Sequence, residues 1–223
     1  MPNRRMLSGT VAVLLRHSSF AWISAILLGG LSVIGCGHLR ADEGGAPLPF
    51  DPARISRLSL DGLPRSLAAA AGGGIWLGYD LERARPFRAW RAKSDEDALS
   101  RSTFTAKPRG KLLFSGPVGD DAEGWRWRRD GRTVVPEVRY LGIRDVNGAF
   151  VLSWELRDGD TAALLHERIG ATESAGAREL RAEGLGTGEV LLPPADLVRH
   201  WKSPDLSEQE LHGDEWHRFD WSE

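Results

Sequence analysis

The sequence predicts an all-β fold, an antiparallel β-sandwich with minor short helices; a closed β-barrel is the alternative. Several segments alternate apolar and polar residues, which is the period of a strand with one buried face. Glycine and proline are frequent, at 26 and 12 of the 223 residues, and they separate these segments at short intervals. Many short strands with little helix are typical of sandwich folds.

The clearest strand is the segment 149–157, which reads AFVLSWELR. Its apolar residues fall on one side of an extended chain: Phe150, Leu152, Trp154 and Leu156. Turn dipeptides bound it, with Asn147-Gly148 before it and Asp158-Gly159 after it. We therefore expect residues 161–169 to return beside it as the second strand of a hairpin.

Ten further segments carry the same strand signals. In chain order they are residues 55–60, 66–71, 74–80, 87–92, 111–115, 125–128, 133–143, 177–183, 189–192 and 216–221. Pro136 interrupts the longest of them, and a proline within a strand predicts an edge position or a bulge. Short helices are expected at 194–201, and at 95–101 or 207–211.

The first 36 residues have the features of an export signal. Arg4 and Arg5 precede an apolar segment of about fifteen residues, whereas a helix that spans a membrane needs about twenty. The end of that segment, Val33-Ile34-Gly35-Cys36, is similar to a bacterial lipobox, in which the chain is cut before a cysteine that carries lipid. We therefore expect a lipoprotein-type signal peptide at 1–36, a flexible tether at 37–52 and a single β-sandwich domain at 53–223. The alternative is an ordinary signal peptide cut near Ala41-Asp42, which would leave a secreted or periplasmic soluble protein.

Charge and cysteine content exclude several classes of protein. Three arginines and no acidic residue precede Cys36, so the rest of the chain carries 26 basic and 31 acidic residues. This mildly acidic balance argues against nucleic acid as a partner, and contact with a membrane is expected only through the lipid anchor. Cys36 is the only cysteine, so no intrachain disulfide can form and the core must hold the fold.

Catalytic and cofactor signatures are missing from the sequence. It contains no G-x-S-x-G, G-x-x-x-x-G-K-[ST], H-E-x-x-H or C-x-x-C-H motif, so no catalytic residue and no cofactor are predicted. The histidines near the C-terminus, His200, His212 and His217, match no metal-binding spacing, and no metal is predicted. An isolated histidine within a predicted strand, His166, is expected to be a hydrogen-bonded structural residue.

Tryptophan is the unusual component of the composition, with nine residues. An indole ring supplies large buried area in a core, but sugar rings also stack on its flat face. Trp154 fits the first role because apolar residues alternate around it. Trp90, Trp125 and Trp127 are the candidates for ligand binding, and core packing is the alternative for them as well.

Five segments together resemble a β-rich domain that accompanies c-type cytochrome modules and sorbosone-dehydrogenase-like propellers in exported bacterial proteins. They are 72–80 (GGGIWLGYD), 89–90 (AW), 106–114 (AKPRGKLLF), 138–143 (VRYLGI) and 150–156 (FVLSWEL), and the resemblance covers about residues 55–192. Arg91-Ala92-Lys93 departs from the Gly-Gly-aromatic sequence that is usual in that domain. The resemblance implies a non-catalytic accessory role in periplasmic or surface carbohydrate oxidation, and no family catalytic residue carries over.

The function expected from these observations is that of a non-catalytic, exported accessory or binding protein. Its partner would be a carbohydrate or a periplasmic redox protein, and Cys36 would anchor it to the cell envelope. One alternative is a polysaccharide-acting enzyme, which requires a cleft with converging carboxylates, histidine or tyrosine. Another is a structural envelope lipoprotein, which would expose an apolar patch to other proteins.

Overall fold

A computed structural model describes residues 54–57, 59–170, 175–206 and 209–222 of the chain. All of them fall within the unit Gly44–Glu223. The predicted signal peptide, its Cys36 and the predicted tether lie outside the described residues. The described residues contain one α-helix, which is four residues long. No helix in this part of the chain is long and apolar enough to cross a membrane.

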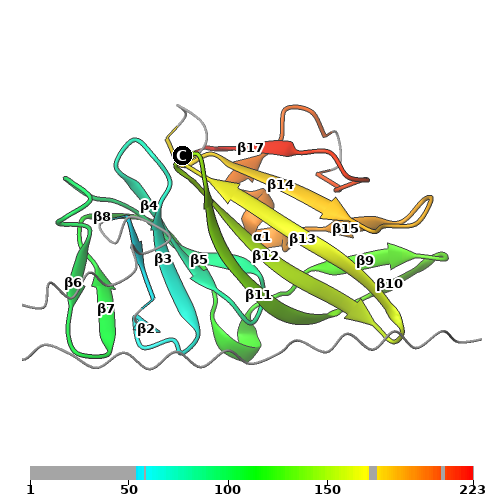
Figure 1. The fold of residues 1–223 in the computed structure, drawn as a ribbon, viewed down its shortest axis with the longest axis horizontal. Helices are drawn as coiled ribbons and strands as arrows, with labels where there is room; N and C mark the ends of the chain where they lie inside the picture. Colours follow the sequence, from blue (N-terminus) through cyan, green and yellow to red (C-terminus); the bar gives the residue numbers. More distant parts are fainter. Residues whose placement is uncertain (1–53, 58, 171–174, 207–208, 223) are drawn as a thin grey trace, which may run out of the picture. The chain divides into compact units, whose positions relative to one another are not determined.

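Strands form almost all of the regular structure (Figure 1). They are β1 (Ile55–Ser56), β2 (Ser59–Leu60), β3 (Ser66–Ala70), β4 (Ile75–Asp80), β5 (Arg85–Arg91), β6 (Leu99–Arg101), β7 (Thr105–Pro108), β8 (Lys111–Ser115), β9 (Arg126–Arg129), β10 (Arg132–Val134), β11 (Glu137–Val146), β12 (Ala149–Asp158), β13 (Thr161–Ile169), β14 (Arg178–Glu183), β15 (Val190–Leu192), β16 (Trp201–Lys202) and β17 (His217–Trp221). The helical elements are a 3-10 turn, η1 (Gly119–Asp121), and α1 (Ala195–Val198).

The strands form four open sheets, so the all-β prediction is confirmed and the barrel alternative is wrong. A five-stranded sheet has the order β1-β3-β4-β5-β8, and a six-stranded sheet has the order β11-β12-β13-β14-β17-β16. Two three-stranded sheets, β10-β9-β15 and β2-β7-β6, complete the set. Among the strands that the structure describes, every pairing is antiparallel except that of β2 with β7.

The main core lies between the five-stranded and six-stranded sheets, as in a β-sandwich. It joins Leu77 and Tyr79 of β4 to Leu152 and Trp154 of β12. The predicted hairpin is confirmed: β12 pairs with β13 from Phe150–Ile169 to Asp158–Thr161, and Phe150, Leu152, Trp154 and Leu156 face the core as expected. The indole N–H of Trp154 donates to the carbonyl of Leu81 at 3.1 Å, which ties the two sheets together.

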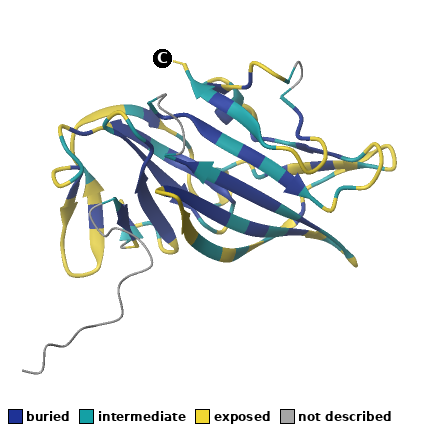
Figure 2. Ribbon diagram, turned by 45° about the horizontal axis from the view of Figure 1, so that its top comes forward, coloured by how far each residue is buried: buried dark blue, intermediate teal, exposed yellow. Residues whose placement is uncertain are grey.

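A second core covers the opposite face of the five-stranded sheet. Trp76 and Trp90 stack there with ring centroids 6.0 Å apart, against Leu60 of β2 and Ala106 of β7. Every residue of β3 and of β4 is therefore buried, so these strands do not show the alternation in burial that β12 has from Leu152 to Arg157 (Figure 2). The region thus has three layers, with the five-stranded sheet in the middle.

Three predictions at the level of elements are wrong. The segment 55–60 is not one strand, because β1 pairs with β3 and β2 pairs with β7, in two different sheets. The segment 133–143 is not one strand, because Pro136 separates β10 from β11; β11 then forms the edge of its sheet, as the proline predicts. Residues 95–101 form a turn and β6 rather than a helix, because Ala98 and Leu99 pack into the second core. The helix expected within 194–201 is present as α1.

A buried polar network crosses the main core. The Tyr79 hydroxyl on β4 donates to Oε1 of Glu167 on β13, and Nη2 of Arg178 on β14 donates to Oε2 of the same carboxylate at 2.7 Å. The guanidinium of Arg178 also lies over the Trp201 ring, 5.4 Å from its centroid. Burial, and then the Glu167 charge, raise the pKa of Tyr79 well above its ordinary value, so its hydroxyl stays a donor.

We expect Glu167→Gln to lower the free energy of unfolding by about 3 kcal/mol or more. The reason is that the substitution leaves the Arg178 guanidinium buried without a counter-charge, and Arg178 is 2 % exposed. Urea unfolding followed by circular dichroism measures the change. Glu96→Gln, at an exposed position, is the control and should leave the midpoint unchanged. Equal midpoints for the two variants would contradict the role of the network.

Candidate functional site

The structure places all three predicted ligand-binding tryptophans in the interior. Trp90, Trp125 and Trp127 each have 0 % exposure. The indole N–H of Trp90 donates to the carbonyl of Ala98 at 2.9 Å, and that of Trp125 donates to the carbonyl of Ala84 at 2.8 Å. Stacking on a sugar needs an exposed ring face, so the prediction that these residues form a binding platform is corrected: they are core residues.

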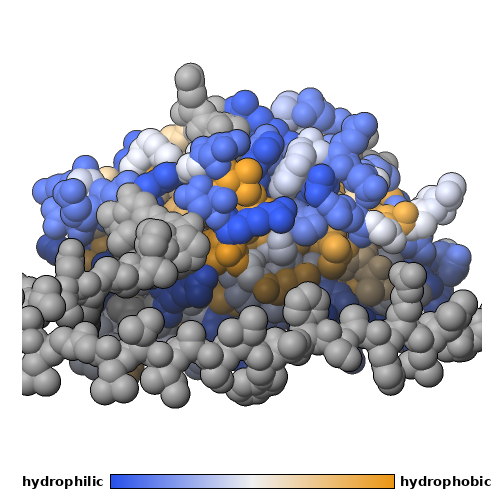
Figure 3. Space-filling model, viewed as in Figure 1, coloured by the Kyte–Doolittle hydropathy of each residue, from blue (hydrophilic) through white to orange (hydrophobic). Residues whose placement is uncertain are grey.

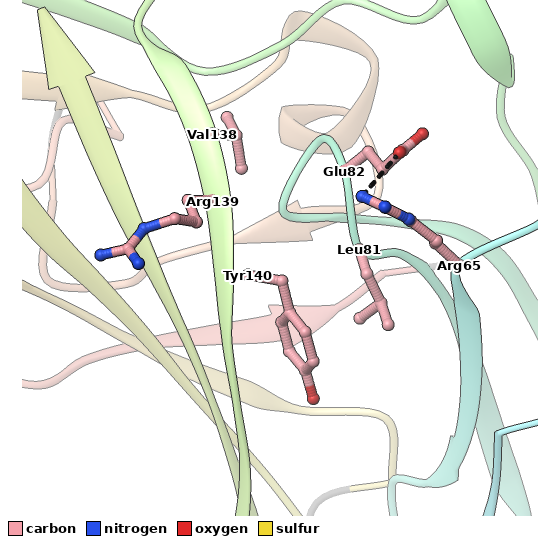
Figure 4. Close-up of a pocket in the computed structure, with 6 residues that line it drawn as sticks. All are labelled: Arg65, Leu81, Glu82, Val138, Arg139 and Tyr140. Atoms are coloured by element: carbon pink, nitrogen blue, oxygen red, sulfur yellow. Dashed lines mark ion pairs between the residues drawn. The ribbon is translucent and has the colours of Figure 1, made fainter.

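A hollow of about 410 Å³ lies instead where the edge strand β11 faces the turn after β4 (Figure 4). Its lining comes from three separate parts of the chain: Arg65, Leu81, Glu82, Val138, Arg139 and Tyr140. On one wall, the Tyr140 ring and Val138 are supported by the core, and the Tyr140 and Trp154 ring centroids lie 5.9 Å apart. On the other wall, Leu81 lies beside an exposed ion pair in which Arg65 Nη1 is 3.2 Å from Glu82 Oε1.

A second hollow of about 280 Å³ shares Glu82 and Val138 with the first and extends to Val135 and Pro136. We call the two together the β11 cleft. Trp125 lies behind the second hollow but has no exposed surface of its own. The β11 cleft has a volume in the range of small-ligand sites.

The chemistry of the β11 cleft is amphipathic. Apolar surface comes from Leu81, Val138 and the Tyr140 ring, whereas Arg65 and Glu82 supply a donor and an acceptor (Figure 4). The Arg139 guanidinium turns away from the hollow and donates to Glu155 at 2.8 Å. Burial raises the pKa of Tyr140, an effect that Arg57 partly offsets, so the phenol is neutral; its buried oxygen has no hydrogen-bond partner among the described residues.

A polar cluster of Ser153, His166 and Glu183 lies on the outer face of the six-stranded sheet. Ser153 Oγ lies 2.8 Å from Nδ1 of His166, and Nε2 of His166 lies 3.5 Å from Oε1 of Glu183. A third hollow, of about 260 Å³, reaches Ser153 because Gly142, opposite it on β11, carries no side chain. His166 is 7 % exposed and hydrogen-bonded, as the sequence predicts for a structural histidine.

Hydrophobic side chains reach the surface among the polar ones near β11. Leu141 and Val146 of β11 are 45 % and 39 % exposed, and Val135 just before the strand is 74 % exposed. Figure 3 shows hydrophobic residues between polar ones near the middle of the face that Figure 1 displays. Within the described ranges, no group of three or more histidine, cysteine, aspartate or glutamate side chains is arranged to hold a metal ion.

Sequence reasoning missed the β11 cleft because no motif marks it. Its walls combine residues 65, 81–82 and 138–140, which only the packing of the two sheets brings together. The one available signal was Pro136, which indicates that an edge strand follows. Comparison with known proteins adds nothing to the assignment, because no family model, no curated protein and no solved structure matches the chain.

We expect His166 to make folding pH-dependent between pH 7.5 and 5.5. Burial, with Arg181 and Arg144 nearby, lowers the pKa of His166, so the unfolded chain takes up the proton at a higher pH than the folded chain. The stability that neutral His166 contributes is therefore present above its ordinary pKa of about 6.5 and is lost as the pH falls. Urea midpoints at the two pH values should differ more for the wild type than for His166→Gln. An identical difference in both proteins would refute this assignment.

Proposed function

We propose that this chain is an exported, non-catalytic accessory protein that binds carbohydrate in the β11 cleft. The observation that carries the proposal is the composition of that cleft. A sugar ring is amphipathic, with an apolar face that packs on aromatic rings and hydroxyl groups that exchange hydrogen bonds. Tyr140 supplies the ring, and Arg65 and Glu82 supply charged hydrogen-bonding groups opposite it.

Two features of the sequence support the same proposal. The basic N-terminus, the apolar segment and Cys36 indicate export and a lipid anchor to the cell envelope. The resemblance to domains that accompany carbohydrate-oxidising modules gives the ligand class, and it also makes a periplasmic redox protein a second binding partner. A cleft that binds sugar beside such a partner would retain substrate near it.

A polysaccharide-cleaving enzyme fits the β11 cleft less well. Canonical glycoside hydrolysis uses two carboxyl groups that flank the scissile bond. The residues that line the larger hollow include one carboxylate, Glu82, which is already paired with Arg65. The lining therefore favours binding over cleavage.

Tyr140→Ala should weaken carbohydrate binding about tenfold. Loss of an aromatic contact is worth about 0.5–1.5 kcal/mol, and 1.4 kcal/mol corresponds to a factor of ten. A glycan array identifies the oligosaccharide, and isothermal titration calorimetry then measures its Kd for each variant. Trp216→Ala is the matched control, because Trp216 is also a partly exposed aromatic residue but lies between Arg168 and Arg181 on the outer sheet face.

The array result alone can reject the proposal. If no glycan is retained at millimolar concentration, the β11 cleft is not a carbohydrate site. Equal losses of affinity for Tyr140→Ala and Trp216→Ala would also reject it, because the effect would then be general rather than local. Tyr140→Phe keeps the ring and should retain most of the affinity.

Replacement of Cys36 should abolish lipid attachment. Bacteria that express the wild type or Cys36→Ala would be grown with radioactive palmitate, and the protein would be recovered from the membrane and soluble fractions. We expect label on the wild type in the membrane fraction and no label on Cys36→Ala. Absence of label from both proteins would instead support the ordinary signal peptide.

A further inference from the structure

The edge strand β11 is the longest unpaired edge of the two large sheets. It spans ten residues, pairs with β12 on one side, and has no strand on its other side among the described residues. An open edge directs alternate backbone N–H and C=O groups to solvent, where another strand can bind them. By contrast, β16 at the opposite edge of the sheet spans only two residues.

Three charged side chains of β11 are exposed and have no ion pair within the described part of the chain: Glu137, Arg144 and Asp145. Asp145 Oδ1 instead accepts a hydrogen bond from the Gly148 N–H at 2.8 Å, which leaves Glu137 and Arg144 without a polar partner there. By contrast, neighbouring charges on this sheet form ion pairs: Arg139 with Glu155 at 2.8 Å, and Arg168 with Glu179 at 2.6 Å. Glu137 and Arg144 have opposite sign and lie near opposite ends of the strand. An antiparallel copy of β11 would therefore place each of them near its counterpart.

A bulge in β11 favours a second copy of this strand as the partner. The register with β12 shifts between Tyr140 and Gly142, so Leu141 is an extra residue. Before the bulge, even-numbered Val138 faces the core; after it, odd-numbered Ile143 does. A regular strand such as β12 must skip Leu141 to keep its side chains in phase on both sides of the bulge. A second, antiparallel copy of β11 carries the same shift, so the two strands can pair residue for residue across it.

In one antiparallel register, inward-facing side chains lie opposite inward-facing ones and charges of opposite sign lie opposite each other. With the two-fold axis at the bulge, Val138 of one copy lies opposite Ile143 of the other, and both face inward. Glu137 then lies opposite Arg144, and both face outward. Arg139 falls opposite Gly142, which has no side chain and nothing within 4 Å of where its Cβ would be. Symmetry repeats each pair, so the interface gains two Glu137–Arg144 ion pairs and two Val138–Ile143 contacts.

We propose that the chain forms a two-fold symmetric dimer through antiparallel pairing of β11, which joins the two six-stranded sheets into one. The pairing would cover Leu141, the exposed apolar residue at the axis. It would also bring the β11 clefts of the two copies together, because Val138 and Tyr140 line the cleft and lie beside the axis. The inference does not depend on the proposed carbohydrate ligand.

Charge reversal tests the register directly. The full chain, in detergent micelles and without added ligand, would be examined by sedimentation equilibrium as wild type, Glu137→Arg, Arg144→Glu and the double variant. We expect the wild type to dimerise. Each single reversal places two like-charge pairs at the interface and should raise the dimer dissociation constant at least tenfold. The double variant restores opposite charges and should recover most of the affinity.

Control variants separate this interface from other causes of association. Arg132→Glu makes the same charge change at an exposed position on β10 and should leave the dissociation constant unchanged. Cys36→Ala should also leave it unchanged, because β11 and not the N-terminal segment forms the contact. A wild type that is monomeric at all concentrations would overturn the proposal. Single reversals that dimerise like the wild type, or a double variant that stays monomeric, would overturn it too.

Discussion

The five-stranded sheet is buried on both faces, and the rest of the described structure depends on this constraint. One face packs on the six-stranded sheet, and the other packs beneath β2, β6 and β7. Two-sided burial explains the alanines of β3 and the close approach at Gly78, where a Cβ would lie 2.3 Å from the Leu60 side chain. It also explains why most of the tryptophans are interior: two cores need more large side chains than one.

The arrangement leaves the long edge of the six-stranded sheet as the place where new contacts form. Strand β11 has residues on its inner side that are only half buried, because the turn after β4 stands away from it and leaves the β11 cleft. No described strand pairs with its other edge, and Glu137 and Arg144 on its outer side have no ion pair within the described ranges. Ligand binding would thus use the inner side of β11 and self-association its backbone edge, and Val138 lies beside both.

The sequence was a good guide wherever local pattern decides the structure. From Leu152 to Arg157 the residues of β12 alternate in burial because one face packs on the core, and the turn dipeptides on either side of the strand set its hairpins. The pattern misled for β6, where Ala98 and Leu99 pack under a distant sheet rather than in a helix. The sequence pattern also could not show that Trp90, Trp125 and Trp127 are buried, because their burial depends on which strands pack above them. The β11 cleft has the same origin: Arg65 and Tyr140 meet only in three dimensions.

The double burial of the five-stranded sheet has a consequence for how the domain comes apart. Strands β3, β4 and β5 supply one wall of each core, so neither core can open without exposing apolar side chains of strands that the other core needs. The Trp76 indole donates to Asp95 Oδ1 at 3.0 Å, and the Trp90 indole donates to the carbonyl of Ala98. These hydrogen bonds tie the turn before β6 to the five-stranded sheet. The three layers would therefore melt as one cooperative unit, without a stable half-folded state.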